Sequence, residues 1–176
     1  QREGRAKDGV DRTETGLLKM LAMARKNEGL GAALQGLNIV PVAISYEFDP
    51  CDALKADELY QKETTGTYKK DENSDINSIV TGMVGHKGHV HVAFGTPLTG
   101  LDDDADEVAA AIDRQIIHEY RLQGTNRLAL EELARTEPSA VPALQAMPDW
   151  AIGDSSRSQF EARLAAVAPP LRPYLL

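Results

Sequence analysis

Apolar residues recur along this chain in two patterns, one typical of helices and one typical of strands. In segment 13–27, Leu17, Leu18, Leu21 and Ala24 recur at helical spacing, which predicts an amphipathic helix capped by Thr13. Segment 38–48 is instead almost continuously apolar as far as position 46, as a strand covered on both faces would be. The two patterns together predict a layered α/β fold.

Two more helices and one more strand are expected between residues 49 and 95. A helix begins at Asp49-Pro50 and ends near position 62, and a polar loop over 64–73 follows it. The next helix is capped by Ser74 or Asp75, ends at Gly85, and carries the apolar residues Ile76, Ile79, Val80 and Met83. Segment 88–95 alternates as a strand does, and its two faces hold Val90, Val92 and Phe94 on one side and His89, His91 and Ala93 on the other.

The last third of the chain is expected to be helical. An acidic run over 102–107 precedes a long helix over 104–122, and carboxylates in a first helical turn complement the helix dipole. We therefore interpret this run as a cap and not as a calcium or magnesium site, since the EF-hand spacing is absent. A further helix is expected over 126–135. From position 137 the chain is rich in Pro and Ala, which predicts short helices, one of them near 158–168.

These elements predict a mixed sheet flanked by helices, with a short helical tail. Residues 1–136 are expected to form the α/β domain and residues 137–176 the helical tail or a small appended subdomain. Apolar residues make up 42% of the chain, and no run of 18 apolar residues suggests a membrane span. The chain lacks an initiator Met and a signal peptide, so we expect it to begin within a longer polypeptide.

Charge is unevenly distributed. The chain has a net charge of −8, but between Arg2 and Lys26 seven Lys and Arg residues outnumber four acids. A small basic segment that contains Gly4 and Gly9 suits an anionic ligand, because glycine lets backbone N–H groups approach and Arg5 offers phosphate a planar fork of donors. The acidic composition of the whole chain makes nucleic-acid binding a poor prediction.

The order of segments after this basic run resembles a known enzyme superfamily. Glu3-Gly4-Arg5, then a helix, then Asn38-Ile39-Val40-Pro41-Val42 are similar to the later blocks of the lysophosphatidate/glycerol-3-phosphate acyltransferases. In that family a Glu-Gly-(Thr)-Arg loop binds the phosphate of the acceptor. Here Gln1-Arg2 replaces the usual apolar-Pro pair, and Arg5 follows the glycine one position early.

The resemblance implies a transfer of a fatty acyl group from acyl carrier protein or coenzyme A to a hydroxyl of a phosphate-bearing glycerol or lysophospholipid, in bacterial phospholipid biosynthesis. It assigns the phosphate site to Glu3, Gly4 and Arg5, with Lys7 and Arg12 as auxiliary cations. It implies no metal and no tightly held cofactor. It also implies a cytoplasmic protein, peripheral to the inner membrane, and the single Cys51 agrees with a cytoplasmic setting.

The catalytic pair of the family, a His with an Asp five positions later, precedes the Glu-Gly block in sequence. None of the four histidines here, His86, His89, His91 and His118, has an Asp at that spacing. We therefore expect no catalytic residue in this chain, a His/Asp pair upstream of it, and no transfer by this segment alone, since attack by a hydroxyl needs a base.

Two other functions stay open from the residues alone. The basic N-terminal loop can belong to a non-enzymatic module that binds an anion or an acidic partner. His89 and His91 share one face of a predicted strand, as ligands do in several metal sites, so a metal-dependent hydrolase is the other alternative. We expect no metal there, because two ligands are fewer than a stable site needs. Cys51 is expected to be a packed or surface thiol.

Overall fold

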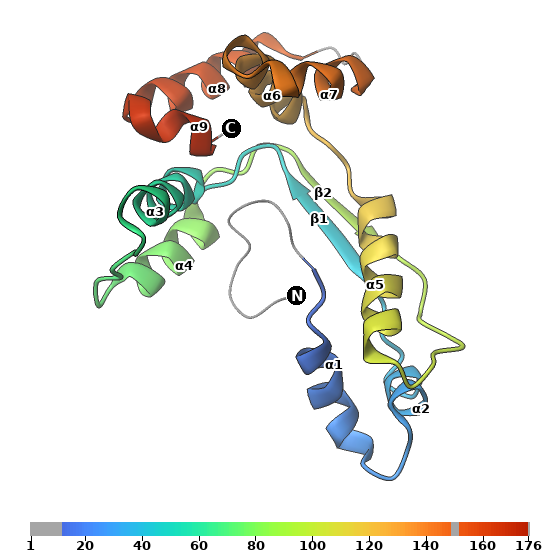
Figure 1. Ribbon diagram of the computed structural model, residues 1–176. Helices are drawn as coiled ribbons and strands as arrows, with labels where there is room; N and C mark the ends of the chain where they lie inside the picture. The colour runs from blue at the N-terminus through green and yellow to red at the C-terminus, as the bar shows by residue number, and fades with distance from the viewer. Residues whose placement is uncertain (1–11, 149–151, 176) are drawn as a thin grey trace. The chain divides into compact units, whose positions relative to one another are not determined.

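The computed structural model describes residues 12–148 and 152–175, and within them the chain is mostly helical with one small sheet (Figure 1). The chain forms two compact units. Unit 1 comprises the chain through Ser45 and then His91 to Arg121. Unit 2 comprises Tyr46 to Val90 and the chain from Leu122 onward. The division predicted between residues 136 and 137 stays a prediction.

Unit 1 is built on three helices, which are α1 (Thr15–Ala22), α2 (Leu30–Gln35) and α5 (Ala105–Glu119), with the 3-10 turn η1 (Met23–Arg25) after α1. The cap of α1 differs from the prediction, because its N-cap is Glu14 and not Thr13. The cap of α5 agrees with it, since the side chain of Asp104 accepts a hydrogen bond from the amide of Asp106 at 2.9 Å. The acidic run therefore does begin this helix.

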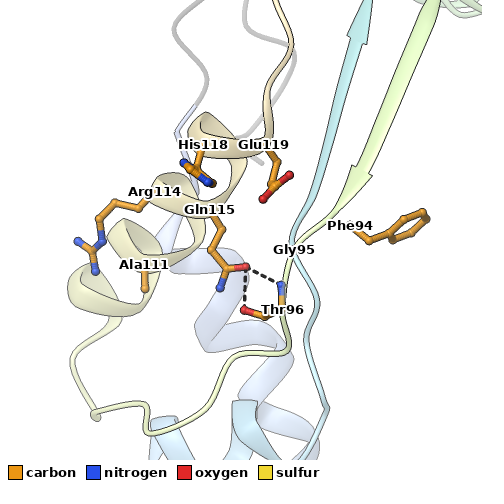
Figure 2. A pocket seen from close by; sticks show the side chains of 8 residues that line it. All are labelled: Phe94, Gly95, Thr96, Ala111, Arg114, Gln115, His118 and Glu119. Carbon is orange, nitrogen blue, oxygen red and sulfur yellow. Dashed lines mark hydrogen bonds between the residues drawn. The ribbon is translucent and has the colours of Figure 1, made fainter.

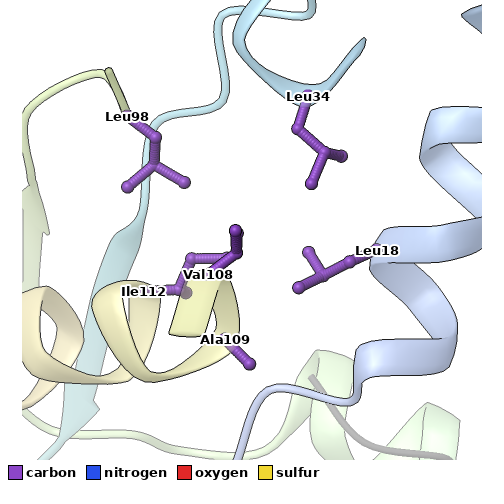
Figure 3. Packing of buried hydrophobic residues seen from close by; sticks show 6 residues of the cluster. All are labelled: Leu18, Leu34, Leu98, Val108, Ala109 and Ile112. Atoms are coloured by element: carbon purple, nitrogen blue, oxygen red, sulfur yellow. The ribbon is translucent and has the colours of Figure 1, made fainter. Parts of the chain in front are cut away.

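The core of unit 1 is a small aliphatic cluster contributed by all three helices and by the segment after the sheet (Figure 3). Its buried members are Leu18, Leu34, Leu98, Val108, Ala109 and Ile112. Of the apolar stripe predicted on α1, only Leu18 is buried, while Leu17 and Leu21 are exposed. Only part of the predicted apolar stripe is therefore buried, because α2 and α5 cover a narrower face of α1 than the stripe occupies.

Among the described residues the sheet consists of two antiparallel strands, β1 (Val42–Tyr46) and β2 (Val90–Phe94), and not the larger mixed sheet that was expected. The amide of Glu47 donates to the carbonyl of His89 at 2.8 Å, and the amide of Gly95 donates to that of Pro41 at 2.9 Å. These two bonds fix one register along the ribbon. β1 is shorter than the predicted segment 38–48, because Asn38 has a positive φ of 52° and Pro41 lacks an amide donor.

The large apolar residues of the sheet lie on its exposed face, whereas a two-sided sheet in a soluble protein usually buries them. Ala43 and Ser45 of β1 are buried. The large apolar residues of the other face are exposed, namely Ile44, Tyr46, Val90, Val92 and Phe94. The expectation that the first strand is covered on both faces is therefore wrong for the described residues, whereas the alternation predicted for β2 is confirmed.

Unit 2 contains α3 (Asp52–Thr65), α4 (Ser74–Val84), α6 (Gly124–Thr136), α7 (Val141–Ala146), α8 (Asp154–Ala166) and α9 (Arg172–Leu175), with the 3-10 turns η2 (Pro138–Ala140) and η3 (Pro169–Leu171). Helix α9 packs on α3, and α6 packs on α7 and α8. The short helices expected in the Pro- and Ala-rich tail are therefore present. Helix α4 ends as predicted, with Gly85 at its C-cap, but its N-cap is Asn73 and not Ser74 or Asp75.

An arginine on α8 joins the tail to the start of α3. The guanidinium of Arg163 donates to the Asp52 carboxylate from Nε at 2.9 Å and from Nη2 at 2.6 Å. Nη2 also donates to the carbonyl of Asp49 at 2.6 Å, and the guanidinium lies 5.2 Å from the centre of the Phe48 ring. Since these interactions bridge more than a hundred residues of sequence, they hold α8 within unit 2.

Candidate functional site

The basic N-terminal segment is the first candidate site. Glu3, Gly4, Arg5 and Lys7 lie outside the described residues, and Arg12 is exposed to solvent. The residue after Arg12 is anchored to α5, because both the amide and the hydroxyl of Thr13 donate to one oxygen of Asp113, at 3.0 and 2.7 Å. These two hydrogen bonds therefore fix Thr13, directly after Arg12, to a helix one hundred residues away in sequence.

A second candidate is a buried carboxylate in unit 2. Glu47 follows β1, and its side chain is only 8% exposed. One oxygen, Oε2, accepts from the amide of His89 at 2.9 Å and pairs with His89 Nδ1 at 2.8 Å. The other oxygen, Oε1, accepts from the Ser156 hydroxyl on α8 at 2.5 Å. The Thr125 hydroxyl on α6 donates to the backbone carbonyl oxygen of Glu47 at 2.5 Å.

These contacts set the charge of Glu47. Burial alone would raise its pKa, but the hydrogen bonds from Ser156 and His89 outweigh burial and hold the pKa below the ordinary value of 4.5. Glycine at position 88 makes the approach possible: its φ is +61°, and a Cβ there would lie 2.9 Å from the Glu47 Cβ. Charged Glu47 thus links the residue before β2, His89, with Thr125 of α6 and Ser156 of α8. We call this cluster the Glu47 junction.

The arrangement around Glu47 superficially resembles a Ser-His-carboxylate triad but differs from it in geometry. In a triad the imidazole lies between the hydroxyl and the carboxylate. Here Ser156 bonds the carboxylate directly, so its proton is not directed at His89. The cluster therefore positions three segments of unit 2 and leaves the His89 ring, 87% exposed, at the surface.

The third candidate is an open groove in unit 1 between the end of β2 and α5, with a volume of about 500 Å³ (Figure 2). Its wall is fixed by Gln115, whose Oε1 accepts from the amide and the hydroxyl of Thr96 at 2.9 and 3.4 Å. Figure 2 shows the Arg114 guanidinium pointing away from Thr96 and Gln115. The described lining of the groove does not include Arg12, the phosphate-binding candidate that lies within the described residues.

The predicted histidine pair and the cysteine are both engaged elsewhere. His91 Nε2 lies 3.3 Å from the carbonyl oxygen of Glu119, while His89 pairs with Glu47. Among the described residues, no group of three or more His, Cys, Asp or Glu side chains is arranged to hold a metal ion. Cys51 is buried, as a packed thiol would be, and its Sγ donates to the carbonyl of Ser78 at 3.3 Å.

Sequence reasoning missed the Glu47 junction. Glu47 ends an apolar strand and has no motif around it. The only signal that could have found it is the antiparallel pairing of the two strands, which places position 47 opposite position 89. The sequence alone does not determine the register of that pairing.

Comparison with known proteins found no match: no family model, no curated protein and no solved structure matches the chain. Within residues 12–148 and 152–175, no helix has both the length and the apolar character needed to cross a bilayer.

Proposed function

We propose that this chain is part of an acyltransferase that moves a fatty acyl group from a thioester to a hydroxyl of a phosphate-bearing glycerol or lysophospholipid acceptor. In this reaction the acceptor oxygen attacks the thioester carbonyl carbon, the C–S bond breaks, and the hydroxyl proton passes through a base to the departing thiolate. The base belongs to the His/Asp pair that the family carries before the Glu-Gly block.

In the proposed enzyme this chain supplies recognition of the acceptor phosphate. Glu3, Gly4 and Arg5 shape the phosphate site, and Lys7 and Arg12 add positive charge. Arginine suits the role because its planar fork matches two phosphate oxygens, and glycine suits it because backbone N–H groups must approach closely.

The observation that carries the proposal is the order of the basic segment, α1 and β1, together with the anchoring of Thr13. Thr13, which follows Arg12 directly, is bonded twice to Asp113 and therefore lies at a fixed point on unit 1. The exposed apolar face of the β1–β2 ribbon supports a layered enzyme fold, since such a face is normally covered by a further layer.

The proposal is tested by measuring binding of glycerol 3-phosphate, and of glycerol as the uncharged control, to the 176-residue chain by titration calorimetry. We expect the phosphate-bearing ligand alone to bind, Arg5→Ala to weaken binding at least tenfold, and Arg5→Lys to restore part of the affinity. The matched control is Arg135→Ala, an exposed arginine on α6 paired with Glu132, which is expected to bind normally.

Equal affinity in wild type and Arg5→Ala would contradict the assignment of the phosphate site. Phosphate binding without acyl transfer by the full natural polypeptide would instead favour the anion-binding module.

A further inference from the structure

In the described part of the chain, the outer edge of strand β2 has no partner strand. Two hydrogen bonds of the ribbon, from the amide of Glu47 to the carbonyl of His89 and from the amide of Gly95 to the carbonyl of Pro41, join odd-numbered positions. Hydrogen-bonded pairs recur at every second residue of an antiparallel ladder. The odd-numbered residues of β2 therefore turn their N–H and C=O groups toward β1, and the even-numbered residues turn theirs to the opposite edge.

This outer edge presents the backbone groups of Val90, Val92 and Phe94. Among the described residues, no loop, helix or side chain forms a hydrogen bond with these three amides and carbonyls. A straight row of alternating donors and acceptors is satisfied by another extended backbone, which adds to the sheet as a further strand. The chemistry of the edge therefore selects a β-strand as its partner.

Strand β2 also lacks two features with which edge strands normally resist such pairing, namely lysine and proline within the strand. Its sequence is Val-His-Val-Ala-Phe. A sheet of two strands is only marginally stable by itself, so the ribbon gains stability when further strands are added. Pairing at this edge therefore favours the fold as well as the assembly.

The free row of backbone groups ends in the groove of unit 1. Thr96 is the next even-numbered position, and its amide donates to Gln115 Oε1 at 2.9 Å, so the free groups stop at Phe94. The groove of about 500 Å³ lies there, between the end of the strand and α5. Figure 2 shows the Phe94 ring pointing away from α5, so this ring does not fill the groove. A further strand can therefore lie against β2 beside α5.

The pattern of β2 is complementary to its own copy. When two β2 strands run antiparallel about a two-fold axis at Val92, Val92 lies opposite its copy and Val90 lies opposite Phe94 of the other strand. Every outward amide then has a carbonyl partner. These pairs join β-branched and aromatic side chains on one face, which stabilises antiparallel sheets. On the other face His91 lies opposite Ala93, so no two like charges meet.

The flank of α5 that lines the groove also suits a second copy. It carries one cation, Arg114, and one carboxylate, Glu119. A two-fold axis brings the same surface of both chains together. A surface with charges of both signs can pair with itself, whereas a surface of one sign would repel its copy.

We propose that this chain forms a dimer in which the outer edges of two β2 strands pair antiparallel about Val92 and give a four-stranded sheet. The partner is a second copy of this chain. The inference rests on the strand register and on the free edge of β2. It does not depend on the phosphate site or on acyl transfer, so each proposal can fail without the other.

Size-exclusion chromatography with light scattering, over a range of protein concentrations, tests the proposal with charges placed at the axis. Wild type is expected to be a dimer at micromolar concentration. Val92→Lys and Val92→Glu each place two like charges directly opposite one another, so each variant alone is expected to raise the dissociation constant of the dimer at least tenfold. An equimolar mixture of the two variants places a lysine opposite a glutamate and is expected to recover the dimer.

The matched control is Ile44→Lys on the outer edge of β1, since the Ile44 and Val92 side chains are both 47% exposed. This control is expected to dimerise within twofold of wild type. Val92→Pro removes the amide donor of the free edge and leaves the bonds to β1 in place, so it is expected to weaken the dimer as well. Circular dichroism of the lysine and glutamate variants is expected to match that of wild type, because the altered side chains are exposed.

Three results would each overturn the proposal. They are a wild type that stays monomeric at every concentration, a dimer that Ile44→Lys weakens as much as Val92→Lys does, and a mixture of Val92→Lys with Val92→Glu that stays monomeric. The last result would show that position 92 does not lie opposite its own copy.

Discussion

Replacing Glu47 by glutamine is expected to destabilise unit 2 by about 2–3 kcal/mol. The carbonyl oxygen of glutamine can still accept from Ser156, but its amide nitrogen then faces the backbone N–H donor of His89. A hydrogen bond to a charged group contributes about 1.5–3 kcal/mol, and an unsatisfied donor costs about 1–3 kcal/mol. The bond to the His89 ring contributes least, because this ring is 87% exposed and water replaces its partner.

The assay is equilibrium urea unfolding followed by circular dichroism at pH 7. With an unfolding slope of about 2 kcal/mol per molar urea, the expected loss moves the midpoint down by about 1 M. The control is Glu137→Gln at an exposed position after α6, which is expected to change stability by less than about 0.5 kcal/mol.

The difference between wild type and Glu47→Gln is expected to depend on pH. Because the pKa of Glu47 is lowered by folding, its stabilising contribution is fully present above the ordinary value of 4.5 and is lost as the pH falls through the lower folded value. The two proteins should therefore differ most at pH 7, and the difference should narrow as the pH falls below 4.5. A midpoint unchanged at pH 7, or a difference that stays constant down to acid pH, would refute the role given to this carboxylate.

Further substitutions test the packing in the same urea assay. Gly88→Ala is expected to cost about 2 kcal/mol or more, since φ is +61° and the new Cβ displaces the Glu47 side chain, and an unchanged midpoint would contradict this. Gly31→Ala is expected to cost about 1–3 kcal/mol, as its Cβ would lie 2.7 Å from the carbonyl oxygen of Asp102, whereas Gly16→Ala in α1 meets open space and is expected to stabilise by about 0.5–1 kcal/mol. Equal effects at the two glycines would be inconsistent with the packing of α2. Arg163→Ala is expected to cost about 2–3 kcal/mol, and a loss below about 0.5 kcal/mol would show that the α8 contact is not structural.

Local patterns predicted individual elements well. Helix α4 ends at Gly85 as expected, β2 alternates as expected, and Asp104 caps α5. Each of these depends on neighbours within a few residues, where spacing and capping chemistry act directly. The boundary of α1 was wrong at its start because the hydroxyl of Thr13 has a distant partner, Asp113, that competes with its use as a cap.

The sequence could not predict which face of an element is covered. The apolar residues of α4 and the apolar face of the sheet have the periodicity of buried surfaces, yet both are exposed among the described residues. On α4 they are Ile76, Ile79, Val80, Met83 and Val84. For α4 one reason is the close approach of Gly85 to the Pro50 ring, which a side chain at position 85 would prevent. The Glu47 junction was missed because it depends on strand register and on contacts to Thr125 and Ser156 far along the chain.

Acyl transfer by the full natural polypeptide tests the central claim most directly. The assay compares wild type, Arg5→Ala and Arg5→Lys on two acceptors, a lysophosphatidate and the monoacylglycerol that lacks its phosphate, with acyl-coenzyme A or acyl carrier protein as donor. We predict that Arg5→Ala lowers kcat/KM for lysophosphatidate at least tenfold, that Arg5→Lys recovers part of it, and that neither variant changes the rate with monoacylglycerol. An equal loss on both acceptors, or no loss on lysophosphatidate, would contradict the claim that this segment recognises the acceptor phosphate.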